Sequence, residues 1–241
     1  MTTTSDLTIV IPAKNEARLL PRLLNSLILQ DYPQISSTKV FLADAHSTDG
    51  TPAVALSYSS WLNIEVIPGG LPSIGRNAGA RRASTPYVLF IDADIELADK
   101  TLVRRSLELM QRKSLHCLTT NISCPRGSVM DRLLYSGNNV MQHLSRLYKP
   151  FSTGMYMMFD KARFDALGGF HEQVAYAEDY LLSQKVARGR FRVVSGCVQT
   201  TNRRFKKMGH FKLVRLFLKT AVNTWNEAYY LRDHKYWQSE A

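Results

Sequence analysis

Two aspartates at the end of a hydrophobic segment are the first residues of this chain whose types and spacing indicate chemistry. Residues Tyr87–Ile91 are aromatic or aliphatic without a break, which is typical of a strand buried on both faces of a parallel sheet. Asp92 and Asp94 follow, and a spacing of two residues directs both side chains to the same side of an extended backbone. Two hard oxygen donors there suit a divalent cation that keeps waters and binds a ligand's phosphates. For an Asp-x-Asp motif taken alone, a solvated strand end is the alternative.

The elements around this motif predict a second acid at the same edge. Leu7–Ile11 and Lys39–Ala43 are expected to be strands, and the latter delivers Asp44 at its end. The remaining elements of this half are expected to be a helix through Leu19–Ile28, a short helix over Ala53–Tyr58, a strand Ile64–Ile67 and a helix Arg76–Ala83. Alternating strands and helices predict a parallel, doubly wound sheet with right-handed crossovers. Ligands of such sheets bind at the carboxyl ends of the strands, so we expect Asp44, Asp92 and Asp94 at one edge.

The second half of the chain has a less regular pattern. It predicts, in order, a helix Lys100–Gln111, a strand His116–Ile122, one or two amphipathic helices within Ser128–Tyr148, a strand Gly154–Phe159, a helix Ala177–Val186 and a strand Phe191–Val194. The apolar side of the Ser128–Tyr148 region contains Met130, Leu133, Leu134, Val140, Met141, Leu144 and Leu147. No composition shift or internal repeat marks a domain boundary.

Composition is that of an ordinary globular chain. Of the 241 residues, 45% are hydrophobic and 21% are charged, and no apolar run approaches the length needed to span a bilayer. The N-terminus lacks the basic region and apolar core of a signal peptide. The three cysteines are odd in number and have no metal-type spacing. We therefore expect a cytoplasmic protein with reduced thiols.

Positive charge is concentrated near the C-terminus. The net charge is +11, and the stretch Arg203–Lys219 contains seven basic residues and no acid, which predicts attraction to polyanions. An apolar stripe at helical spacing accompanies them, formed by Phe211, Val214, Leu218, Ala221, Val222, Trp225 and Tyr229. A basic amphipathic helix of this kind is typical of a peripheral contact with the inner face of a membrane. The alternative is that the stripe packs on the rest of the protein.

Taken in order, these features resemble the family 2 glycosyltransferases of the GT-A fold over about residues 7–205. The segments that carry the resemblance are Ile11-Pro-Ala-Lys-Asn-Glu16, Asp44 with Ser47-Thr-Asp-Gly-Thr51, Gly75-Arg-Asn-Ala-Gly79, Asp92-Ala-Asp94, Leu167-Gly-Gly-Phe170 and Glu178-Asp179. The resemblance implies an α/β fold with a doubly wound, mainly parallel sheet and helices on both faces. It also implies a single catalytic domain over 1–241. In it, about 7–95 binds the nucleotide sugar, about 96–205 is the acceptor half, and about 206–241 is a basic amphipathic helical segment.

The resemblance further implies a nucleoside-diphosphate sugar donor and a Mg²⁺ or Mn²⁺ cofactor. It assigns metal contact chiefly to Asp94, with Asp92 as second metal residue that faces the ribose or orients the site, and it assigns Asp44 to the nucleotide base. Ala45 and His46 depart from the family's usual second acid and glycine. The other residues implied at the donor are Pro12, Ala13, Asn15, Glu16, Arg76, Arg203 and Arg204.

These three arginines also have a simpler interpretation. The resemblance directs Arg76 to the base or the diphosphate, whereas a solvated helix residue is the alternative. Arg203 and Arg204 are suited to bidentate contact with phosphate, but they are equally consistent with the general basic character of the C-terminal region.

By the same resemblance, Asp179 is the general base that deprotonates the acceptor hydroxyl, and Glu178 supports or orients it. The alternative is that Glu178 and Asp179 are ordinary acids at a helix start, where the helix dipole favours negative charge. A base rather than a nucleophile implies a single displacement that inverts the anomeric centre.

Two other functions compete with sugar transfer. A sugar-1-phosphate nucleotidyltransferase would carry a glycine-rich basic loop after the first strand, where this chain has Pro12–Glu16 and no glycine. A non-catalytic nucleic-acid-binding protein would use the positive charge, but acids at the strand ends repel phosphate unless metal is bound. We therefore expect no nucleic-acid partner. The donor sugar, the base and the acceptor stay open, and a lipid-linked or membrane-borne acceptor is among the candidates.

Overall fold

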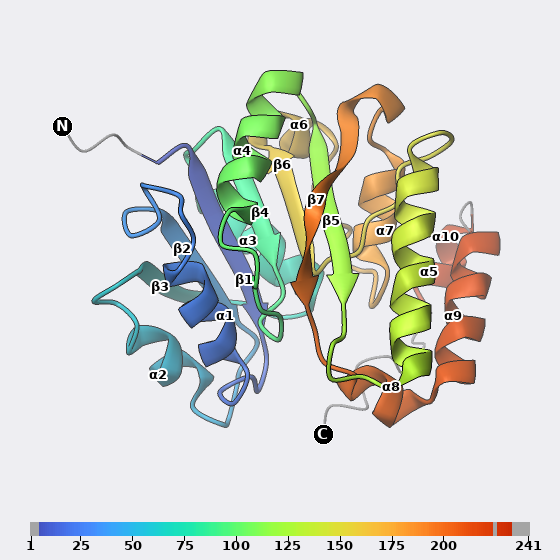
Figure 1. Ribbon diagram of the computed structural model, residues 1–241, viewed down its shortest axis with the longest axis horizontal. Helices are drawn as coiled ribbons and strands as arrows, with labels where there is room; N and C mark the ends of the chain where they lie inside the picture. The colour runs from blue at the N-terminus through green and yellow to red at the C-terminus, as the bar shows by residue number, and fades with distance from the viewer. Residues whose placement is uncertain (1–4, 224–225, 233–241) are drawn as a thin grey trace.

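The computed structural model describes residues 5–223 and 226–232 of the protein. The strands are β1 (Leu7–Ala13), β2 (Lys39–Asp44), β3 (Asn63–Pro68), β4 (Tyr87–Ile91), β5 (Cys117–Ser123), β6 (Tyr156–Asp160) and β7 (Phe191–Gln199). The helices are α1 (Leu20–Ile28), α2 (Thr51–Leu56), α3 (Pro72–Arg82), α4 (Leu102–Lys113), α5 (Val129–Ser145), α6 (Lys161–Ala166), α7 (Glu178–Gln184), α8 (Arg203–Met208), α9 (His210–Val222) and α10 (Glu227–Tyr230). Within the described residues the strands form one sheet in the order β3-β2-β1-β4-β6-β5-β7 (Figure 1).

The sheet is mainly parallel, as the sequence predicts. Strands β3, β2, β1 and β4 pair in parallel, and so do β5 and β7. Strand β6 lies between β4 and β5 and is antiparallel to both, a direction that the sequence pattern did not reveal. In the middle of the sheet, residues Val88 to Ile91 of β4 are inaccessible to solvent, which confirms the prediction of a strand buried on both faces.

Alternation along the strands divides the core into two layers. In β2, Val40 and Leu42 belong to the layer that contains residues of α1 and α4, while Phe41 and Ala43 belong to the opposite layer. That opposite layer also contains residues of α3, α6 and α7, so helices cover both faces of the sheet. Helix α6, which the sequence pattern did not predict, contributes Phe164 to it. The close approach of α3 to β1 requires Gly79, because a Cβ there would overlap the side chain of Val10.

Helix α5 is a single helix, and its apolar stripe has an unexpected orientation. The periodicity correctly predicts a helix over this region, but Met130, Leu133, Met141 and Leu144 are exposed. The side chains of α5 that are buried are instead polar, those of Asp131 and Gln142.

The C-terminal helices are attached to α5 by polar and aromatic contacts. His210 at the start of α9 hydrogen-bonds Asp131 through Nε2, 2.6 Å from Oδ1, and its ring stacks on Phe205 of α8. Asn202 also donates to Asp131, at 2.9 Å. Thus Asp131 joins the first turn of α5 to the segment that leads into α8 and α9.

The outer face of α9 does not pack on the rest of the protein. Phe211, Leu218 and Val222 are exposed to 83%, 64% and 78%, so the alternative that the stripe packs on the rest of the protein is wrong for these three residues. Trp225 of the same stripe lies outside the described residues, as do residues 233–241 of the C-terminal segment. Among the helices that are described, none is long and apolar enough to cross a membrane.

Replacing Asp131 by Ala is expected to destabilise the protein. The backbone N–H of Ser128 and the side chains of Asn202 and His210 would each lose their acceptor at a buried position. We expect the free energy of unfolding, measured by urea denaturation, to fall by about 2–4 kcal/mol. As a control, Asp165→Ala removes an exposed i,i+4 partner of Lys161 and should change stability by less than about 1 kcal/mol. Equal effects of the two substitutions would contradict this role of Asp131.

Candidate active site

Adjacent strand ends bring the expected donor-binding residues together. In the parallel register of β1 and β2, Pro12 lies opposite Ala43 and Ala13 opposite Asp44. Asp44 accepts a hydrogen bond from the N–H of Ser47 through Oδ2, at 3.1 Å. Its Oδ1 is buried and has no hydrogen-bond partner among the described residues. An acceptor oxygen held in this way is suited to a ligand N–H.

The two loops that follow these strands are tied to one another. Asn15 adopts a left-handed conformation with φ of 54°, and its side-chain oxygen accepts from the N–H of Thr48 at 2.9 Å. The N–H of Asn15 donates to Ser47 Oγ at 2.9 Å, and the N–H of Glu16 donates to Thr51 Oγ1 at 2.8 Å. The Ser-Thr-Asp-Gly-Thr sequence therefore fixes the position of the Asn15–Glu16 turn beside Asp44.

Arg76 lies at the centre of a buried group of charges. Its side chain is only 3% exposed, so the alternative that it is a solvated helix residue is wrong. The guanidinium donates to Asp92 Oδ1 at 2.6 Å and forms a close ion pair with Glu178. It also contacts the carbonyl of Gly154 at 3.4 Å and lies over the ring of Phe170, 5.4 Å from its centroid. The expected contact of Arg76 with a donor stays a prediction.

Glu178 and Asp179 open α7 beside this arginine. The Asp179 carboxylate accepts from the backbone N–H of Gly154 through Oδ2 and from that of Tyr180 through Oδ1, the latter at 2.7 Å. Burial raises the pKa of Glu178 to about 7 against the opposing charge of Arg76, and repulsion from Asp179 adds to the shift. Burial also raises the pKa of Asp179 above its usual value, although Arg76 and the two N–H donors oppose it. Glu178 thus has the environment of a proton acceptor that works near neutral pH, and the pKa of Asp179 is shifted in the same direction.

A second charged group surrounds Asp94. Arg203 pairs with Glu16 through both guanidinium Nη atoms, and its Nη2 lies 3.3 Å from Asp94 Oδ2. Burial raises the pKa of the Asp94 carboxyl to about 6, and the charges of Asp92 and Glu16 add to the shift. Arg203 and Arg204 oppose it, which places both cations near this carboxyl. The structure therefore brings Glu16 and Arg203 together at Asp94, a pairing that the sequence did not predict.

Gly154 is a site residue that the sequence analysis missed. Its N–H and carbonyl contact Asp179 and Arg76, and a Cβ at this position would lie 2.5 Å from Arg76 Nη2 and 3.1 Å from Asp179 Oδ2. A glycine just before a strand was the available signal, but its meaning depends on the two side chains that converge on it. These contacts bring Asp179 and Arg76 together at the Gly154 backbone.

The donor set at Asp94 fits a hard divalent cation that retains other ligands. No group of three or more His, Cys, Asp or Glu in the described ranges is arranged to hold a metal ion by itself. Asp94 and Asp92 supply carboxylate oxygens, and Asp94 Oδ2 already contacts a cationic side chain. Mg²⁺ and Mn²⁺ are commonly bound by one or two carboxylates together with waters and substrate phosphates, so the residues present fit such an ion.

Comparison with a family model gives a match over most of the chain. The model of glycosyl transferase family 2 matches residues 8–168. This range contains the strand ends with Asp44, Asp92 and Asp94, and it ends before Asp179.

Relatives and solved structures agree with that match. The poly(ribitol-phosphate) beta-N-acetylglucosaminyltransferase TarS of Staphylococcus aureus is 33% identical over 39% of this chain and 17% of its own length. The 4,4'-diaponeurosporenoate glycosyltransferase of Staphylococcus haemolyticus is 22% identical over 93% of this chain and 61% of its own. The chain thus spans less than two thirds of either relative.

Two solved structures have the same fold. The mannosyltransferase PcManGT of Pyrobaculum calidifontis, solved with GDP-Man and Mn²⁺, gives a TM-score of 0.70 at 22% identity and covers 92% of this chain and 65% of its own. TarS with UDP-GlcNAc gives 0.64 at 24% identity over 82% of this chain and 58% of its own. The likeness confirms the expected GT-A fold.

The raised pKa of Glu178 predicts a measurable pH dependence of stability. The unfolded chain releases this proton near pH 4, whereas the folded protein holds it until about pH 7. The contribution of Glu178 to the free energy of unfolding is therefore greatest below pH 4 and is lost as pH rises toward 7. We expect Glu178→Gln to lose less stability than the parent protein between pH 4.5 and 7.5, measured by urea denaturation at each pH.

Glu172→Gln provides a control of opposite sign. Hydrogen bonds from Arg81 and Asn77 lower the pKa of Glu172, so its contribution is present above pH 4 and is lost as pH falls. Removing the Glu172 carboxylate should make the fall in the free energy of unfolding between pH 4.5 and 7.5 steeper. Identical pH profiles for Glu178→Gln and the parent protein would contradict the buried, proton-holding state of Glu178.

Proposed function

The chain belongs to glycosyl transferase family 2, and on that premise we propose that it transfers a sugar from a nucleoside-diphosphate donor to an acceptor hydroxyl with inversion at the anomeric carbon. The observation that carries the proposal is the convergence of three acids on one buried arginine, one from the end of β4 and two from the start of α7. Arg76 contacts Asp92 and Glu178 directly, and the negative charge of Asp179 raises the pKa of Arg76 further. Charged groups buried in this way are concentrated at functional sites.

Donor recognition is assigned to the ends of β1 and β2. The free lone pairs of Asp44 Oδ1, buried beside the Asn15–Glu16 turn, suit the N–H of a nucleotide base. Pro12, Ala13 and Asn15 are proposed to line the same pocket, with Glu16 at its border. The solved relatives carry GDP-Man in one case and UDP-GlcNAc in the other, so both kinds of base belong in a test of this chain.

The diphosphate is assigned to Asp94, which, like Glu16 at the border of this pocket, contacts Arg203. When bound there, Mg²⁺ or Mn²⁺ would act as a Lewis acid that neutralises charge on the leaving diphosphate. Asp94 would hold it, with Asp92 nearby. Arg203 Nη2 contacts Asp94 Oδ2, so a metal ion bound to this oxygen would compete with Arg203. Arg203 and Arg204 would then be available to the phosphates as bidentate donors.

We propose a positioning role for Arg76 in place of the donor contact that the resemblance implies. Its Nη atoms are directed to Asp92 and Glu178, and its burial leaves little freedom to exchange them for a ligand. We infer that Arg76 holds the end of β4 and the start of α7 in a fixed relation. The metal-binding carboxylate and the proton acceptor would then stay correctly spaced across the bound sugar.

Asp179 is assigned the proton transfer. It would accept the proton of the acceptor hydroxyl as that oxygen forms its bond to the anomeric carbon, while the bond to the diphosphate breaks and its electron pair leaves with the diphosphate. Backbone N–H donors fix both carboxylate oxygens, and burial raises the carboxyl's pKa toward the range useful for a base. Attack opposite the leaving group inverts the configuration.

The acceptor is proposed to be lipid-linked or membrane-borne. The two relatives named above differ in the acceptor that their names give, so they do not specify one for this chain. A membrane-borne acceptor agrees with the basic, apolar outer face of α9, where Lys212, Arg215 and Lys219 lie beside exposed apolar side chains. Peripheral contact with a membrane is part of this proposal.

Substitution of Asp94 by Asn tests the metal-binding assignment. The purified protein would be screened with Mn²⁺ and a panel of UDP-, GDP- and TDP-sugars, read by thermal shift and by release of free nucleotide. With the donor so identified, Asp94→Asn is expected to lower metal-dependent turnover by about tenfold or more, because it removes one ligand charge. The exposed Asp165→Asn serves as control. Unchanged turnover by Asp94→Asn, or full turnover in EDTA, would rule out the assignment.

Substitution of Asp179 by Asn tests the base. Asn keeps the size of the side chain but cannot take the proton, so transfer is expected to fall by about 10²-fold or more while donor affinity, measured by titration calorimetry, is retained. Glu172→Gln, an exposed acid outside the site, should transfer normally. If Asp179→Asn transfers normally and Glu178→Gln does not, the two roles are exchanged.

A further inference from the structure

Helix α5 exposes its apolar side chains and buries its polar ones. The exposed fractions are 60% for Leu133, 59% for Met141 and 53% for Leu144. The complete set of exposed apolar residues on α5 and the turn after it is Val129, Met130, Leu133, Val140, Met141, Leu144, Leu147 and Tyr148. Helical spacing places most of them on one side of the helix. A contiguous exposed apolar surface of this kind marks an interaction site.

This orientation is fixed by hydrogen bonds to the sheet. Asn139 donates to the carbonyl of Ile122 at 2.8 Å and accepts from its N–H at 2.9 Å. Gln142 is fully buried, donates to the carbonyl of Thr120 and accepts from the N–H of Thr153. Turning the apolar face inward would break these hydrogen bonds and leave the polar groups of Asn139 and Gln142 without their partners. The exposure of the apolar face is thus built into the fold.

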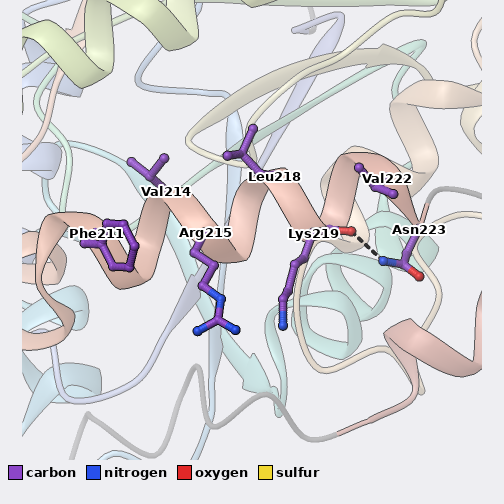
Figure 2. A pocket seen from close by; sticks show the side chains of 7 residues that line it. All are labelled: Phe211, Val214, Arg215, Leu218, Lys219, Val222 and Asn223. Carbon is purple, nitrogen blue, oxygen red and sulfur yellow. Dashed lines mark hydrogen bonds between the residues drawn. The ribbon is translucent and has the colours of Figure 1, made fainter.

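Helix α9 presents a second exposed apolar stripe at the same end of the molecule. Figure 1 draws α9 next to α5, and the bond from His210 to Asp131 joins their first turns. A shallow groove of about 340 Å³ runs along α9, lined by Phe211, Val214, Arg215, Leu218, Lys219, Val222 and Asn223. Figure 2 shows Val214 and Leu218 on one side of the helix and the side chains of Arg215 and Lys219 on the other.

Apart from the buried Asp131, the charged residues of α5 and α9 are basic. The sequence has no acid from residue 132 to 159 and none from 180 to 226. Asp131, the acid within α5, is buried and paired with His210. The basic residues in or beside the two helices are Arg132, Arg146, Lys149, Lys206, Lys207, Lys212, Arg215 and Lys219. A surface that combines exposed apolar side chains with an excess of basic residues is complementary to an anionic lipid headgroup region.

We propose that the exposed apolar faces of α5 and α9, with their basic borders, are a docking surface for an anionic membrane. This inference rests on the proposed function and extends it, because it identifies α5 as a membrane-contacting element in addition to the C-terminal segment. A second copy of the chain is disfavoured as the occupant, since it would bring two positively charged faces together.

The docking surface adjoins the candidate active site through a short run of residues. Asp131 at the start of α5 accepts from Asn202, and the next residue, Arg203, contacts Glu16 and Asp94. A membrane held by α5 and α9 would therefore lie close to the segment that carries Arg203 to the proposed diphosphate site. Docking would present a lipid-borne hydroxyl to the site.

Vesicle co-sedimentation tests the proposal with the full chain. We expect binding to vesicles of phosphatidylglycerol and phosphatidylcholine, little binding to phosphatidylcholine alone, and weakening as salt rises. The double substitution Met141→Gln and Leu144→Gln should lower the affinity for anionic vesicles by about tenfold or more. The triple substitution of Lys212, Arg215 and Lys219 by Gln should do the same. Leu29→Gln with Leu56→Gln, two exposed leucines elsewhere on the surface, is the matched control and should bind normally.

Several results would overturn the docking surface. They are no binding to anionic vesicles, equal binding by the α5 variant and its control, or a dimer in sedimentation velocity that the α5 variant disrupts. If the melting temperature falls further in the α5 variant than in its control, Met141 and Leu144 are packed against the protein. That result would also count against docking.

Nucleotide release in solution separates this inference from the proposed function. The α5 variant should release nucleotide from donor and Mn²⁺ at the parent rate when no lipid is present. A parent protein that binds vesicles but releases no nucleotide from any donor would contradict the proposed function and leave docking intact. Normal nucleotide release without vesicle binding would contradict docking alone.

Discussion

The buried guanidinium of Arg76 connects the parts of the candidate site. It extends from α3 and pairs with Asp92 at the end of β4 and with Glu178 at the start of α7. A buried guanidinium is tolerated when it is paired and hydrogen-bonded to carboxylates, so the position of Arg76 depends on both Asp92 and Glu178. Asp94 and Asp179 are close neighbours of these acids in sequence. The separation between the proposed metal site and the proposed base therefore depends on this one arginine.

The sequence was sufficient to predict the part of the site that strand geometry determines. Carboxyl ends of parallel strands meet at one edge, so the positions of Asp44 and Asp92 followed from finding the strands before them. The same reasoning predicted the mainly parallel sheet and the burial of β4. It did not reveal that β6 runs antiparallel, because a short apolar segment has no direction that its composition can specify.

Contacts between distant segments could not be predicted from the sequence. The pairing of Arg203 with Glu16 joins residues far apart in the chain, and Gly154 matters only because two side chains converge on its backbone. In α5 the periodicity located the apolar stripe but not the side that faces the sheet. That side is decided by the hydrogen bonds of Asn139 and Gln142 to backbone groups of β5. A helix can bury its polar face where a strand offers such partners, and the apolar face is then left for an external surface.

A crystal structure with a bound nucleoside-diphosphate sugar and Mn²⁺ tests the central claim most directly, namely that Arg76 positions the site and does not bind the donor. The account predicts that Arg76 keeps its contacts with Asp92 and Glu178, that the metal lies on Asp94, and that Arg203 has left the Asp94 carboxylate. A structure in which Arg76 has released both acids to bind the diphosphate would contradict it.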